Sequence, residues 1–139
     1  MGYFFWLASI GFSVFAYAWP VSLLVVGWLV WAGAGAWRRR TVVEPAARRL
    51  LLLGFATPVL LLLYGTLHAA GPEWTPQPGA AIAPAVVYGA LLVHLAVVAT
   101  IAYRSRAGRS LILAAGMLQL WVAIGMGFVA LMSVSGVWL

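Results

Sequence analysis

The sequence predicts an all-α integral membrane protein, folded as a bundle of four transmembrane helices. Of its 139 residues, 65% are hydrophobic and only 7% are charged. Soluble domains carry about 25% charged residues, so this chain lacks the polar groups needed to cover a surface exposed to water. The mean hydropathy of +1.07 also indicates a membrane protein. This composition excludes a soluble enzyme and, because cysteine is absent, a disulfide-linked secreted module.

Four apolar segments are long enough to cross a bilayer, which takes about 20 helical residues. They belong to one membrane domain, and the predicted spans cover residues 20–37, 46–70, 84–103 and 110–137 of the chain 1–139. Pro45 suits a first helical turn and places the start of the second span near it. Pro58 is expected to kink that span. The Pro- and Gly-rich residues 71–83 predict a loop outside the membrane.

The apolar segment before the first arginines is too long for one simple span. A straight helix from Gly2 to Trp37 would be roughly 54 Å long, against a hydrocarbon core of about 30 Å. Pro20 divides this segment, and aromatic residues, which favour the membrane–water boundary, crowd its first half. We expect a kinked or partly interfacial N-terminal segment followed by the span 20–37. One long tilted helix whose end packs on a partner is the alternative.

The positive charges predict the topology. All eight arginines lie in or next to the first and third connections between spans, namely Arg38, Arg39, Arg40, Arg48, Arg49, Arg104, Arg106 and Arg109. Positively charged connections stay in the cytoplasm. Connections 38–45 and 104–109 are therefore predicted to be cytoplasmic, and the loop 71–83 and both termini to be external. Two short clusters between apolar runs do not form the exposed basic patch of a nucleic-acid-binding protein.

Two polar side chains lie deep in the predicted spans, His94 in the third and Gln119 in the fourth. Each is ten residues from an arginine at the cytoplasmic edge and so about 15 Å deep. Because the two spans are consecutive and antiparallel, we expect a hydrogen bond between His94 and Gln119 that joins the helices.

Intramembrane ionisable residues also suggest function. The alternative is therefore that His94 or His68 is an axial ligand of a haem or of a chlorophyll-type pigment. His68 shares a helix face with Thr57 and Tyr64, and it lies nineteen residues beyond Arg49, about 28 Å along the helix. The two histidines therefore differ too much in depth to ligate one haem from both sides.

No pattern of catalytic or metal-ligating residues is present, because cysteine is absent and the two acids, Glu44 and Glu73, flank opposite ends of the second span. We expect a non-catalytic accessory or anchoring subunit of a larger complex in a bacterial cytoplasmic membrane, of an electron-transfer or energy-converting kind. Its partners would be other membrane subunits and lipids, with no cofactor. The alternatives are the haem- or pigment-binding protein above, and a carrier or enzyme for a hydrophobic substrate such as quinone or lipid.

Overall fold

The computed structural model describes residues 2–70, 78–105 and 107–136. Met1, Arg106 and residues 71–77 and 137–139 lie outside the described residues. They include parts of the predicted loop 71–83, of the predicted connection 104–109 and of the last predicted span. All regular elements within the described ranges are helical: α1 (Gly2–Tyr17), α2 (Trp19–Arg38), α3 (Pro45–Gly54), α4 (Ala56–Leu67), the 3-10 turn η1 (Pro78–Ala81), α5 (Ala83–Arg104) and α6 (Arg109–Ser135). Four helical segments are long and apolar enough to cross a membrane, and together they indicate a multi-pass membrane protein.

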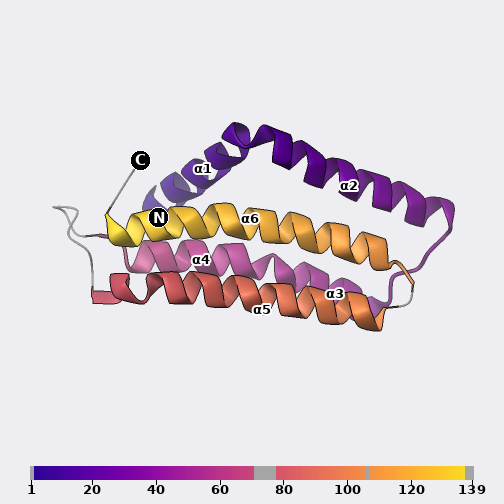
Figure 1. Cartoon of the computed structure of the whole chain (residues 1–139). Helices are drawn as coiled ribbons and strands as arrows, with labels where there is room; N and C mark the ends of the chain where they lie inside the picture. Colours follow the sequence, from indigo (N-terminus) through magenta and orange to yellow (C-terminus); the bar gives the residue numbers. More distant parts are fainter. Residues whose placement is uncertain (1, 71–77, 106, 137–139) are drawn as a thin grey trace.

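Helix α6 is the centre of the fold and contacts every other α-helix of the described chain (Figure 1). Its long row of alanine, glycine and valine side chains is buried, which lets neighbouring helices approach closely. Helix α6 approaches α4 closely, because a Cβ added to Gly65 would lie 2.8 Å from the backbone Cα of Ala130. The hydroxyl of Ser133 donates a hydrogen bond to the carbonyl of Gly65 at 2.8 Å, one turn away on the same seam.

The first and third connections lie at one end of the bundle (Figure 1). Gly108, with a φ of +75°, ends the short turn from α5 into α6 in a conformation that favours glycine. A Cβ on Gly108 would lie 3.0 Å from Cγ2 of Val43 in the first connection, so the two arginine-rich connections touch. The start of α1 and the end of α6 lie at the opposite end of the bundle (Figure 1). Which end faces the cytoplasm stays a prediction from the arginines.

The second span is interrupted where the sequence predicts a kink. Helix α3 ends at Gly54 and α4 begins at Ala56, with Phe55 between them donating its N–H to the carbonyl of Leu52 at 3.2 Å. Pro58 has no N–H to offer to the carbonyl of Gly54 four residues earlier, which is the usual cause of such a break. The span ends at Leu67, three residues before the predicted boundary at residue 70.

The long N-terminal segment is divided into two helices that together follow the length of α6 (Figure 1). The Tyr3 hydroxyl lies 3.0 Å from the Ser133 hydroxyl, near the end of α6. At the other end of α1, the chain bends at Ala18, and the indole N–H of Trp121 donates to the Ser22 hydroxyl at 3.2 Å. Trp121 lies in the middle of α6, so the bend is at mid-height of the bundle.

The aromatic first half of the segment is thus a packed part of the bundle rather than a free end. Leu7 of α1 is completely buried and joins a core cluster with Leu62, Met126 and Val129. The ring of Phe15 packs edge-on against Trp121, with centroids 6.0 Å apart. The predicted division near Pro20 is therefore present, and α2 corresponds to the predicted span 20–37 with one more residue at each end.

Candidate functional site

The break between α3 and α4 creates the polar centre of the bundle. Because the N–H of Phe55 bonds to Leu52, the carbonyl of Leu51 is left without its usual helical partner. The side-chain amide of Gln119 donates to this carbonyl. Gly54 makes room for the contact, because a Cβ at this position would collide with the Gln119 side chain. The Gln119 side chain of α6 therefore supplies the hydrogen bond that the Leu51 carbonyl loses at the break in the second span.

His94 of α5 lies beside this junction and is only 5% exposed. Its Nδ1 forms a hydrogen bond of 3.2 Å with the hydroxyl of Thr57, in the first turn of α4. Among the described residues, His94 Nε2 and Gln119 Oε1 are the buried side-chain polar atoms that have no hydrogen-bond partner.

Both free atoms belong to residues that line one cavity of about 200 Å³ between α3, α4, α5 and α6. When the Thr57 hydroxyl donates to Nδ1, the imidazole carries its proton on Nε2 and becomes a donor. The Gln119 Oε1 is an acceptor. Buried atoms of this kind are commonly satisfied in proteins by a small molecule that both accepts and donates, such as water. We call this cavity the His94 pocket.

The sequence predicted the two main residues of the His94 pocket, His94 and Gln119, but their observed hydrogen bonds go to other groups. His94 bonds to Thr57 and Gln119 to the backbone of Leu51, and no direct His94–Gln119 bond is among the hydrogen bonds of the described residues. The role of Leu51 was missed. Pro58 predicted that the helix backbone near Leu51 would be disturbed, but it did not predict that the Gln119 side chain would bond to the exposed carbonyl.

The structure does not bring His68 to this pocket. His68 is the exposed residue that follows the end of α4 at Leu67, and its ring packs against Tyr64 with centroids 4.7 Å apart. The two histidines are thus in separate environments. In the described part of the chain, no three His, Cys, Asp or Glu residues lie close enough together to hold a metal ion.

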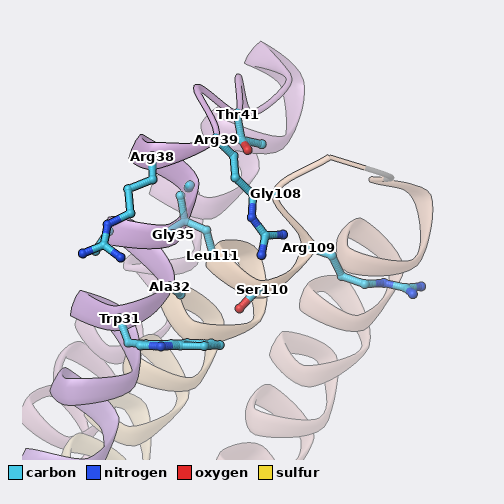
Figure 2. A pocket seen from close by; sticks show the side chains of 12 residues that line it. Trp31, Ala32, Gly35, Arg38, Arg39, Thr41, Gly108, Arg109, Ser110 and Leu111 are labelled. Carbon is cyan, nitrogen blue, oxygen red and sulfur yellow. The ribbon is translucent and has the colours of Figure 1, made fainter.

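A second and larger cavity, of about 520 Å³, lies between the end of α2 and the start of α6 (Figure 2). Figure 2 shows the Arg39 side chain directed into the space between the two helices, toward Ser110. Arg38 lies on the outer side of α2, and Arg109 turns away from the cavity. The Nε–H of Arg109 donates to the carbonyl of Ala102 at 2.9 Å, which ties the start of α6 to the end of α5. We call this cavity the Arg39 pocket.

From the sequence, the arginines were expected only to determine topology, but three of them line the Arg39 pocket: Arg38, Arg39 and Arg109. The side chains of Arg48, Arg49 and Arg104 are exposed and do not line it. Arg40 adopts a left-handed backbone conformation, with a φ of +48°, at the sharp turn after α2. No local sequence signal marks the pocket, because it forms between segments that are seventy residues apart.

Comparison with known proteins adds no identification: no protein-family model, no curated protein and no solved structure matches the chain.

Proposed function

We propose that this protein is a small non-catalytic subunit of a larger membrane assembly, and that the uncovered side of α2 binds a helix of another subunit. The observation that carries this proposal is the packing of α2, which contacts only α1 and α6 among the described helices. Val25 and Ala32 are its only buried residues. No other helix in the described ranges covers the remaining surface of α2.

The uncovered side of α2 has the form of a helix-packing surface. Its residues repeat at intervals of four, three and four, and all are exposed: Leu23, Gly27, Val30 and Ala34. A Cβ added to Gly27 would meet nothing within 4 Å. Small residues at such spacing allow another transmembrane helix to approach closely. We call these four residues the outer face of α2.

The use of the polar side chains inside the bundle supports a structural role over a catalytic one. Thr57 and His94 join α4 to α5, Gln119 joins α6 to α3, and Ser133 joins α6 to α4. Hydrogen bonds of this kind hold membrane helices together. The assembly that we expect is an electron-transfer or energy-converting complex, and the proteins that co-purify with the chain would identify its class.

The test is co-purification of the full-length chain from its native membrane in polymer nanodiscs, followed by mass spectrometry of the bound subunits. Gly27→Leu should reduce the yield of the partner several-fold, because a leucine fills the space that the partner helix needs. Gly89→Leu is the matched control, since a Cβ on Gly89 of α5 also meets nothing within 4 Å. Equal partner yields in both variants, or a wild-type chain that purifies alone, would contradict the proposal.

A second candidate function is binding of a small polar ligand to His94, favoured by the two unpaired atoms of the His94 pocket. The cavity of about 200 Å³ is smaller than pockets for drug-sized ligands, which measure about 300–1,000 Å³. This size suits water or the carbonyl group of a hydrophobic molecule such as a quinone better than a haem or chlorophyll ring. An absorption spectrum and extraction of bound quinone from the purified protein distinguish these ligands.

A further inference from the structure

We propose that the Arg39 pocket binds the headgroup of an anionic phospholipid. Its volume of about 520 Å³ falls within the range of about 300–1,000 Å³ that is typical of small-molecule sites. The Arg39 pocket shares only Ala34 with the outer face of α2 and no lining residue with the His94 pocket. The inference holds whether or not the chain belongs to an assembly.

The charge of the pocket selects an anion. Arg38, Arg39 and Arg109 line it, and no carboxylate is among its lining residues. The guanidinium of Arg39 extends between the helices toward the Ser110 hydroxyl (Figure 2). An arginine fork binds two phosphate oxygens at once, and a hydroxyl can donate to a third. Arg38 adds positive charge at the outer rim, while Arg109 is turned away and bonded to Ala102.

The position of the pocket favours a lipid over a free anion. It lies at the end of α2 and the start of α6, where the arginines are, which is where apolar spans reach the headgroup region. The Trp31 indole extends below the Arg39 guanidinium (Figure 2), and indole rings favour this boundary. Ala32 and Leu111 continue the lining as apolar surface toward the membrane interior. A glycerol backbone and its acyl chains can occupy this surface, whereas a free phosphate cannot use it.

Basic pockets between membrane helices bind anionic lipid headgroups in other proteins, especially on the cytoplasmic side. The predicted topology places the Arg39 pocket on that side, where anionic lipids attract basic residues. The start of α6 adds to the attraction. Gly108 precedes it without a side chain to cap the first N–H groups, which therefore remain available to an anion.

The test uses the full-length chain in nanodiscs that contain phosphatidylcholine and a minor fraction of phosphatidylglycerol, with native mass spectrometry to count the lipids that the released protein retains. The wild-type chain should retain phosphatidylglycerol in preference to phosphatidylcholine. Arg39→Gln should lower this retention about tenfold, as expected for loss of charge-assisted hydrogen bonds to phosphate. Arg48→Gln is the matched control, because Arg48 is exposed on α3 and does not line the pocket.

A second variant tests the cavity without changing the charge. Gly35 lines the pocket, and a Cβ added there would meet nothing within 4 Å, so Gly35→Phe should fill the space and also lower retention. Circular dichroism confirms that each variant is folded. Equal losses in Arg39→Gln and Arg48→Gln would refute the proposal in favour of a general charge effect. Equal retention of both lipids by the wild-type chain, or displacement of the bound lipid by millimolar inorganic phosphate, would also refute it.

Discussion

The contact between Gly65 and Ala130 makes the replacement Gly65→Ala a sharp test of the α4–α6 seam. The new Cβ would lie 2.8 Å from the Cα of Ala130, which is backbone and cannot rotate away. Ordinary carbon–carbon contacts are about 3.5–4.0 Å, so the helices would have to separate by about 1 Å. Overpacking of this kind costs about 1–3 kcal/mol. Separation would also stretch the Ser133–Gly65 hydrogen bond, a type of bond worth about 0.6 kcal/mol in membranes.

The free energy of unfolding is measured by adding sodium dodecyl sulfate to the protein in mixed micelles and following helicity by circular dichroism. Gly65→Ala should lower it by about 1–3 kcal/mol. Gly89→Ala is the control and should change it by less than about 0.5 kcal/mol, because its Cβ meets no atom within 4 Å. If Gly65→Ala is as stable as Gly89→Ala, helices α4 and α6 do not approach each other as closely as described.

Two further predictions concern topology and the His94 pocket. If both arginine-rich connections are cytoplasmic, a membrane-impermeant thiol reagent should label Ala81→Cys, and not Ala107→Cys, in intact cells; labelling of Ala107→Cys would reverse the orientation. His94→Gln should be tolerated with a stability loss of about 0.6 kcal/mol and up to 1.7 kcal/mol, as expected for one interhelical hydrogen bond, and the purified wild-type protein should have no visible absorption band. A visible band that His94→Gln removes would instead identify His94 as the ligand of a haem or pigment.

The elements of the fold could be predicted largely from local sequence. Helix α5, expected over residues 84–103, extends over Ala83–Arg104, and α6 begins one residue before the predicted boundary. Long apolar runs bounded by arginine or proline mark spans directly, because the bilayer requires about 20 apolar residues in a helix. Pro58 and Pro20 likewise marked the two interruptions, since proline lacks the N–H that a helix needs.

The candidate site could be predicted only in part. His94 and Gln119 were predicted to lie near each other because they share the same depth in the membrane, and depth follows from counting residues along a helix. Their actual partners, Thr57 and the Leu51 carbonyl, depend on how each helix is rotated about its axis. The Arg39 pocket depends on how α2 lies against the start of α6, which no local pattern encodes.

The sequence alone thus determined the class of protein, the position of its spans and the grouping of its arginines, because these follow from hydropathy and charge along the chain. Only the tertiary structure decided which faces of the helices meet. Soluble helices mark their buried face by alternation of apolar and polar residues, but α2 and α6 are apolar on all sides. In such helices shape selects the contacts, as where Gly65 admits Ala130 and Gly54 admits Gln119. Such a fit depends on the surfaces of two helices at once, so it is defined only in the tertiary structure and not by the sequence of either helix.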